Sequence, residues 1–388
     1  MRNITILLLL CTLAFPAAGQ CRDGQRQGGR GFLEELSGRN RFNWEYDADF
    51  HYIFDNREFA YSDDAWIPSG TMHTIVFAPT VGFSIQQSRR VHHRLTAGVE
   101  FAHDMGSHTW ADLAREPLIF YDVHVQARRG VFEALAGIFP RRYMEGSYSE
   151  AFFTGMFRNS DRNLEGVLLK WRAQRFYTEL GLDWMGQYGP QTRERFQIVS
   201  AGQWQAAWWL SLGWTGSFYH YACSGQAQNV VDNHLLEPWL KMDFSRRTSW
   251  QELSAQLGGY VGYQRNRTLE AQPRFPFGGE LKLTARRWGV MLQNTTYFGG
   301  NLMPYFRDTD PAGLPYATNL YFGSPFYEGF HDLAELAWTP QLTHYLSLRL
   351  AARAYFGAEG FRGWQQICSL RFSLDALRHR DTALGRCL

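Results

Sequence analysis

Acidic and imidazole side chains recur at every second position of residues 44–54, where Glu45, Asp47, Asp49 and His51 alternate with aromatic or small residues. Successive side chains of a β-strand point to opposite faces, so this spacing predicts one charged face and one apolar face. A row of fixed carboxylates can act on polar solutes, and a carboxylate beside an imidazole can transfer a proton. On a single strand, however, such a pair is more often structural than catalytic.

No catalytic motif accompanies these residues. The sequence contains neither G-x-S-x-G nor H-E-x-x-H, which mark serine hydrolases and zinc proteases. His103, Asp104, His108 and Asp112 have a spacing that could hold a metal ion or activate a water, but loop histidines are more often simply solvated. No Cys/His spacing suits zinc. The sequence therefore predicts that the protein is not an enzyme and has no metal site and no cofactor.

Basic residues alternate with apolar ones further along the chain. They include Lys282, Arg286, Arg349, Arg353 and Arg371. If the first and last strands are neighbours, the last three of these arginines would lie close to Glu45, Asp47 and Asp49. Opposed charges lining a pore create a field that selects polar solutes. The alternative is a set of ion pairs that only stabilises the wall.

The same alternation defines sixteen segments that would position these side chains. They are approximately residues 43–54, 71–87, 92–104, 117–128, 131–140, 163–173, 175–186, 194–206, 207–220, 231–244, 249–265, 273–287, 288–300, 328–340, 344–357 and 363–376. Tight and longer connections follow one another in turn, with 358–362 counted among the longer set. This regular order predicts an all-β, up-and-down antiparallel barrel with short turns at one end, and an even strand number is typical of membrane barrels.

Composition places such a barrel in a membrane. Arg2, the apolar stretch 4–15 and the small residues Ala17-Ala18-Gly19 predict a signal peptide over residues 1–19. The mean hydropathy of −0.36 is low, but half of the strand residues of a wide barrel face water. The aromatic content of 16%, with 14 Trp, suits interfacial girdles. A formal net charge of +2 gives no indication of nucleic-acid binding.

On strand number, period and loop order, the chain resembles the sixteen-stranded porins of the Gram-negative outer membrane. The resemblance is architectural and covers residues 43–377, with a periplasmic arm at 20–42 and a periplasmic tail at 378–388. It implies pore-lining charges and a third outer loop, about 141–162, that folds into the barrel and narrows it. The alternative for this loop is packing against neighbouring outer loops. The candidates in that loop are Arg141, Arg142, Glu145, Arg158 and Arg162. One departure is the polar tail, because many such proteins end on an aromatic residue that the assembly machinery reads.

The longest predicted loop, 301–327, is rich in aromatic residues and carries carboxylates. Candidate ligand contacts there are Tyr305, Phe306, Asp308, Asp310, Tyr316, Tyr321 and Phe322. Aromatic faces flanked by carboxylates suit sugar rings. The alternative is a lid that packs on itself, held by its prolines.

These patterns predict a channel for the passive diffusion of small polar or carbohydrate solutes, in contact with outer-membrane lipid and the outer-membrane assembly machinery. A monomer and a homo-oligomer both fit them. The alternative is a barrel with a plugged lumen that binds a surface polysaccharide or a partner. Cys21 and Cys387 lie near the two ends of the mature chain, which closure of a barrel would bring together. A disulfide between them, two free thiols and a lipid on Cys21 all remain open.

Overall fold

The computed structural model describes residues 41–59, 69–106, 113–222, 224–225, 228–270, 272–305, 327–340 and 342–374. These residues all belong to Arg39–Leu388, the second of the chain's two compact units. The expected signal peptide and C-terminal tail lie outside the described residues, as does the expected N-terminal arm except for Arg41 and Phe42. No helix in the described part of the chain is long and apolar enough to cross a membrane.

The described residues form sixteen strands and three short helices. The strands are β1 (Arg41–Phe59), β2 (Gly70–Ser88), β3 (Val91–Asp104), β4 (Ala114–Ala127), β5 (Gly130–Pro140), β6 (Asn163–Ala173), β7 (Phe176–Gly186), β8 (Arg195–Ala207), β9 (Leu210–Tyr221), β10 (Val231–Asp243), β11 (Glu252–Asn266), β12 (Phe277–Arg287), β13 (Val290–Gly299), β14 (Gly329–Trp338), β15 (Leu346–Gly357) and β16 (Gly360–Ser373). The helices are η2 (Arg141–Tyr143), α2 (Gly155–Ser160) and η3 (Ser245–Arg247).

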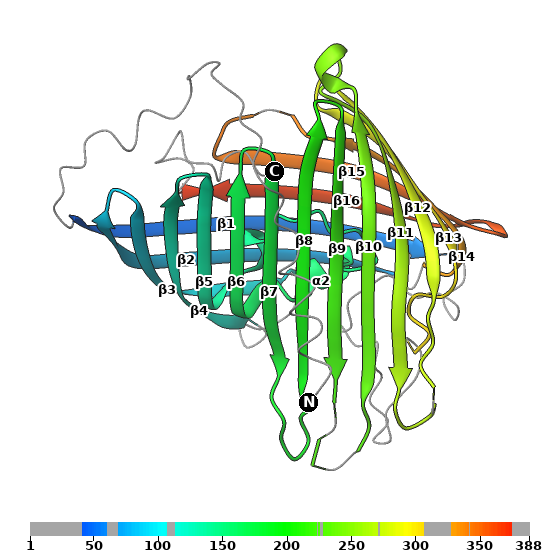
Figure 1. Cartoon of the computed structure of the whole chain (residues 1–388), viewed down its shortest axis with the longest axis horizontal. Coiled ribbons are helices and arrows are strands. Elements are labelled where there is room, and N and C mark those ends of the chain that lie inside the picture. The colour runs from blue at the N-terminus through cyan, green and yellow to red at the C-terminus, as the bar shows by residue number, and fades with distance from the viewer. Residues whose placement is uncertain are drawn as a thin grey trace. The chain divides into compact units, whose positions relative to one another are not determined.

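The sheet closes on itself. Every strand pairs antiparallel with its neighbours in the sequence, and β1 also pairs with β16, from Asp49 opposite Ser373 to Phe59 opposite Gly363. Figure 1 shows this closure as the blue first strand beside the red last strand. The prediction of an antiparallel up-and-down barrel of sixteen strands is confirmed. β1 continues to Phe59, beyond its predicted end at residue 54.

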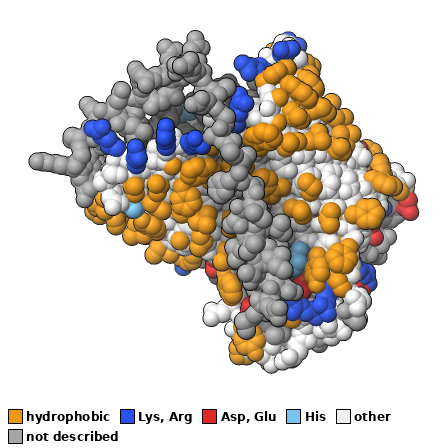
Figure 2. All heavy atoms as spheres, viewed as in Figure 1, with side chains coloured by type: hydrophobic (Ala, Val, Ile, Leu, Met, Phe, Trp, Pro, Cys, Tyr) orange, Lys and Arg blue, Asp and Glu red, His pale blue; other side chains and the backbone are white. Residues whose placement is uncertain are grey.

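The alternation of the sequence becomes an outer and an inner face of the wall. On β1 the outward Phe42, Trp44 and Tyr46 are 53%, 70% and 54% exposed, whereas the inward Asp49 and Asp55 are 6% and 2% exposed. Apolar side chains are spread over the outer face that is visible in Figure 2. Such a face is stable only against lipid, and a closed sheet leaves no unpaired strand edge to desolvate. The barrel therefore belongs in the outer membrane.

The two ends of the barrel carry connections of different length. The connections at one end are the short turns 89–90, 128–129, 174–175, 208–209 and 288–289, together with 244–251 and 339–345. Those at the other end have at least eight residues each, except for the last one. There the prediction of a loop over 358–362 was wrong, because β15 and β16 join through Ala358 and Glu359 alone. Gly360 follows with φ of +108°, a conformation that lets a tight hairpin close and that glycine adopts without steric cost.

Candidate functional site

The long connection between β5 and β6, residues 141–162, lies inside the barrel and is called the inner segment below. At its start Arg142 pairs with Asp49 on β1. Further along, the hydroxyl groups of Ser149 and of Tyr260 on β11 are hydrogen-bonded at 2.8 Å. Because β1 and β11 are well separated in the strand order, these contacts carry the segment across the lumen, as the porin resemblance implies.

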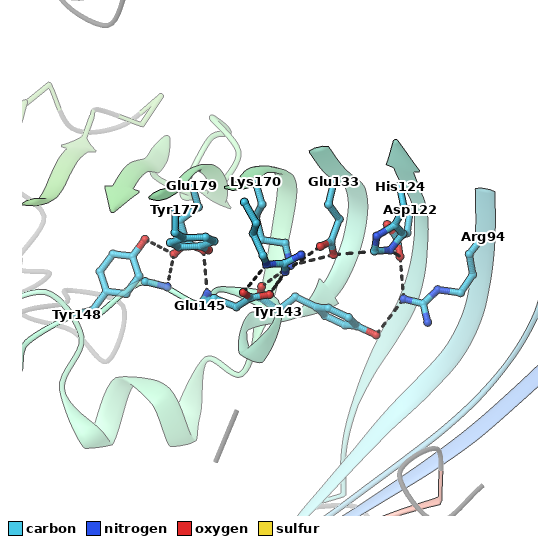
Figure 3. A network of polar contacts seen from close by, with 12 residues as sticks. Arg94, Asp122, His124, Glu133, Tyr143, Glu145, Tyr148, Lys170, Tyr177 and Glu179 are labelled. Atoms are coloured by element: carbon cyan, nitrogen blue, oxygen red, sulfur yellow. Dashed lines mark hydrogen bonds and ion pairs between the residues drawn. The ribbon is translucent and has the colours of Figure 1, made fainter. Parts of the chain in front are cut away.

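A single carboxylate fixes the entry of the inner segment. Glu179 on β7 accepts hydrogen bonds from the backbone N–H groups of Glu145 at 2.8 Å and Gly146 at 2.9 Å, and from the hydroxyl group of Tyr148 at 2.7 Å. The hydroxyl of Tyr177 donates to the same carboxylate. Figure 3 shows Glu179 at one end of a polar network that joins the segment to the wall. Glu179 is 1% exposed, so these bonds form away from bulk solvent, where losing one is costly.

The network continues through Glu145, which reaches back to the wall. Its carboxylate pairs with Lys170 at 3.1 Å and with Arg172, both on β6. Burial acts to raise the pKa of Glu145, but Arg172 and Lys170 outweigh it and hold that pKa below its usual value. Lys170 also pairs with Glu133 on β5 at 2.9 Å. The segment is thus held by ion pairs as well as by hydrogen bonds.

The network ends at the wall on β3 and β4. Asp122 lies between His124 at 3.1 Å and Arg94 at 2.8 Å, and the Arg94 guanidinium group also donates to the Tyr143 hydroxyl group at 3.5 Å. Asp122, His124 and Glu133 offer ligand atoms that lie within 4.8 Å of one another. Because Arg94, Lys170 and Arg172 already neutralise the two carboxylates, we assign this cluster to anchoring and not to a metal ion.

Aromatic packing holds the second half of the inner segment. Phe152, Phe153 and Phe157 are at most 2% exposed and join a cluster with inward residues of β8, β9, β10, β11 and β13. The rings of Phe153 and Phe157 stack with centroids 5.6 Å apart, and Thr154 caps α2 by accepting a hydrogen bond from the Phe157 N–H at 3.1 Å. Burying one such side chain contributes about 1.5–3 kcal/mol. This half of the segment therefore fills one side of the lumen as a small core.

A cavity of about 320 Å³ remains between the inner segment and the wall that β1, β2, β3 and β16 form. Its volume is in the range of small-molecule sites. The lining is mixed, with Ile53, Val76 and Phe153 beside charged side chains. The charged and imidazole groups of the lining are Asp49, His51, Glu100, Arg141, Arg142, Arg158, Arg162 and Arg371.

Positive charge is in excess around this cavity. Asp49 is shared between Arg142 and Arg371, the latter at 3.3 Å, and Glu100 pairs with Arg162 at 2.6 Å. Arg141 is neutralised behind the lining by Asp161 at 2.9 Å and Asp183 at 2.7 Å.

Arg158 differs from these arginines. It is exposed, and its guanidinium group donates to the backbone carbonyl of Tyr148 at 3.0 Å. Within the described part of the chain, no ion pair of Arg158 is found. It is therefore the cation of the lining that is best placed to meet a solute.

The predicted charged ladder is present, but its partners differ from the expectation. Glu45, Asp47 and Asp49 share the inner face of β1, since the outward positions between them carry Trp44 and Tyr46. Of the three arginines expected beside this ladder, only Arg371 pairs with it in the described structure. The expectation for Arg349 and Arg353 was wrong.

The register of the sheet explains this correction. β16 separates β15 from β1, and Glu335 on β14 lies directly opposite Arg353. Arg349 and Arg353 each pair with Glu335 at 2.5 Å. Arg353 also reaches Glu150 of the inner segment at 3.2 Å, so it still faces the lumen.

The other predicted basic residues lie on the inner face as well. Lys282 is 3.7 Å from Glu280, and Arg286 is 3.8 Å from Glu252. Neither residue lines the cavity beside β1. Their proposed part in solute passage stays a prediction.

The candidates in the predicted loop 301–327 lie mostly outside the described residues, which include Tyr305 but not Phe306, Asp308, Asp310, Tyr316, Tyr321 and Phe322. Tyr305 is 2% exposed, and its hydroxyl group donates to Glu270 at 2.8 Å. Its ring packs in the interior cluster instead of facing a ligand. Cys21 and Cys387 also lie outside the described residues, so their pairing stays open.

Sequence reasoning did not single out the residues that hold the inner segment. No local pattern indicates that Glu179 binds the backbone at Glu145 or that Glu335 binds two arginines of β15. His51 was considered only as a weak partner of Asp49, whereas it lines the cavity and its ring lies 2.7 Å from the Ser369 hydroxyl group.

No protein-family model and no curated protein sequence matches this chain. Solved structures do match it. OccK2 (OpdF) of Pseudomonas aeruginosa, in complex with glucuronate, is 12% identical at a TM-score of 0.50, over 86% of this chain and 98% of that one. A loop-deletion mutant of OmpT, an outer membrane protein of Vibrio cholerae, is 12% identical at a TM-score of 0.49, over 86% and 99%. A mutant of the Rh. blastica porin is 9% identical at a TM-score of 0.45, over 86% and 100%.

The fold is that of an outer-membrane porin. At these identities the likeness concerns the fold alone, and it assigns the barrel to no particular family. The likeness therefore identifies neither the solute nor the activity of the barrel.

Proposed function

We propose that this barrel is a porin-like channel for the passive diffusion of small polar solutes. The observation that carries the proposal is the charged cavity of about 320 Å³ between the inner segment and the wall. Barrels of this strand number enclose an aqueous lumen unless it is plugged. Here the aromatic half of the inner segment fills one side, which leaves the charged side as the path. The proposal involves no bond making or breaking.

The lining gives this path a preference among solutes. Fixed charges in a narrow, poorly solvated passage attract counter-ions and replace part of their hydration. Arg142, Arg158, Arg162 and Arg371 face the cavity with two carboxylates, Asp49 and Glu100. We therefore expect small anions and neutral polar solutes to pass more readily than cations.

Single-channel recording in a planar lipid bilayer tests the proposal. The refolded full-length protein should give stepwise conductance, and the same preparation heated to unfold the barrel should give none. A barrel that inserts into the bilayer but never conducts would refute the channel and leave the fold intact.

A second candidate is a barrel that binds a polysaccharide or partner at its outer loops while the lumen stays closed. The aromatic cluster favours it, because the cluster joins the inner segment to Leu302, Met303 and Tyr327 at the long-loop end. Deleting residues 306–326 separates the two functions. A binding barrel should lose retention of a soluble dextran probe without gaining conductance, whereas a channel should keep conducting.

A further inference from the structure

The short-turn end of the barrel carries a ring of arginines that the proposed channel does not use. This basic rim consists of Arg89, Arg90, Arg128, Arg129, Arg175, Arg246, Arg247 and Arg287, which lie in or directly beside the short turns. The seven connections at this end contain no Asp or Glu. Asp243 and Glu252 lie directly beside the connection 244–251, but Glu252 pairs with Lys241 at 2.9 Å and Asp243 accepts hydrogen bonds from the backbone and hydroxyl groups of Ser245. The rim therefore carries a net positive charge.

These arginines differ from those of the lumen in their partners. The inward Arg94 pairs with Asp122, and the inward Arg353 pairs with Glu335. In the described structure, by contrast, no ion pair of a rim arginine is found. All of the rim arginines are exposed except Arg287, which is half-buried. Exposed like charges repel one another, and no described ion pair within the protein offsets this repulsion. The rim arginines are therefore available to a partner outside the protein.

The rim lies where the apolar outer wall ends. Trp204, Val290 and Trp338 lie near the strand ends that meet the short connections and are 50%, 43% and 45% exposed. Figure 2 shows Lys and Arg side chains in a row along one edge of the apolar outer face. At this level a membrane changes from hydrocarbon to headgroups, so the rim arginines face headgroups.

Aromatic contacts orient part of the rim toward this level. The Arg247 guanidinium group lies 4.4 Å from the ring centroid of Trp208, and that of Arg287 lies 4.2 Å from the ring centroid of Trp288. Tryptophan rings anchor proteins at the headgroup region, and guanidinium groups on their faces keep their hydrogen-bond donors available. Such donors suit phosphate oxygens, which the guanidinium fork can bind in pairs.

We propose that the basic rim binds the phosphodiester headgroups of anionic phospholipids in the leaflet that meets the short turns. The ligand class follows from the unpaired like charges, their position at the end of the apolar wall and the geometry of guanidinium binding to phosphate. The inference depends on the membrane placement of the barrel and not on whether its lumen conducts.

Native mass spectrometry of the folded full-length barrel tests the proposal. The barrel is mixed with equal amounts of phosphatidylglycerol and phosphatidylcholine that have the same acyl chains, and the retained lipids are counted. The test variant combines Arg89→Gln, Arg90→Gln, Arg128→Gln and Arg129→Gln. The matched control replaces the same four residues by Lys, which keeps the charge.

Wild-type protein should retain phosphatidylglycerol over phosphatidylcholine by about fivefold or more. The Lys control should keep a smaller preference, because it keeps the charge but lacks the guanidinium fork, and the Gln variant should lose most of the preference. Equal retention of both lipids by wild-type protein, or an unchanged preference in the Gln variant, would overturn the proposal.

Two further measurements cover the remaining outcomes. If the Gln variant does not fold, the wild-type preference is measured between about 50 mM and about 500 mM NaCl, where an electrostatic site should weaken strongly. A preference that does not change with salt would then count against the rim. Saturable binding of soluble polyglutamate without any lipid preference would assign the rim to an acidic macromolecule and would also reject the proposal.

Discussion

Glu179 holds the start of the inner segment to the wall. It accepts two backbone N–H groups and two tyrosine hydroxyl groups while it is 1% exposed. Glu179→Gln keeps the size of the side chain but removes the charge and turns one acceptor into a donor. We expect a loss of about 1–3 kcal/mol in the anchoring of the segment. Single-channel recording should show a larger and noisier conductance.

Glu252→Gln is the matched control for this change. Glu252 is also an inward carboxylate, but it pairs with Lys241 at 2.9 Å and has no contact with the inner segment among its described partners. Its replacement should leave the conductance unchanged. Equal traces for the two variants would mean that Glu179 does not set the width of the path.

Arg158 should set the ion preference of the path, because it is exposed and forms no ion pair among the described residues. Arg158→Gln removes a positive charge without depriving any described carboxylate of its ion-pair partner. We expect the anion-to-cation permeability ratio, measured from the reversal potential in a KCl gradient, to fall about two- to fivefold, which corresponds to about 0.5–1 kcal/mol for one screened charge.

Arg158→Lys keeps the charge and should keep the wild-type permeability ratio. A ratio that falls equally in both variants would show that the shape of the guanidinium group matters and not its charge. A permeability ratio that keeps its wild-type value in both variants would show that Arg158 does not line the path.

At the scale of elements, the turn between β15 and β16 allows a test of backbone strain without a change in packing. Gly360 has φ of +108°, and a Cβ atom added there would meet nothing within 4 Å. Gly360→Ala should therefore act through the backbone alone and cost about 1–2 kcal/mol. Urea unfolding of the barrel in lipid vesicles, followed by tryptophan fluorescence, measures this cost.

Gly259→Ala is the control, since its added Cβ atom also meets nothing within 4 Å but its backbone does not have positive φ. It should change the unfolding midpoint much less than Gly360→Ala. If both variants unfold alike, the backbone conformation at Gly360 is not what shapes this turn.

The strands could be predicted from the sequence because their signal is local. Each one carries its own alternation, and the predicted and observed bounds of β6, 163–173, agree. The turn at Gly360 could not be predicted in this way. The alternation of apolar and polar residues does not distinguish a glycine that continues a strand from one with positive φ. The inner segment was expected from a resemblance, whereas its anchors on Glu179 and Tyr260 are contacts between distant positions that no local pattern encodes.

At the scale of the whole molecule, the barrel depends on a seam between its first and last strands. Asp55 on β1 is 2% exposed and accepts a hydrogen bond at 2.7 Å from the side-chain amide of Gln365 on β16, while it pairs with Arg57 at 2.5 Å. Asp55 and Gln365 are 310 positions apart in the sequence. Contacts this distant form only after a large loss of chain entropy, so the seam should close late in folding.

Asp55→Asn removes the negative charge from this seam and leaves Arg57 buried without its partner. Breaking a buried ion pair from one side costs about 3–5 kcal/mol. The pair of Glu252 with Lys241 is only half-buried, so solvent screens it and its loss should cost less. In urea unfolding of the barrel in vesicles, Asp55→Asn should lower the stability several times more than Glu252→Gln. Because the seam closes late, most of the loss should be seen as faster unfolding, with the folding rate nearly unchanged. If the loss of stability in Asp55→Asn appeared instead as slower folding, the contact between the first and last strands would form early in assembly. That result would contradict this order of closure.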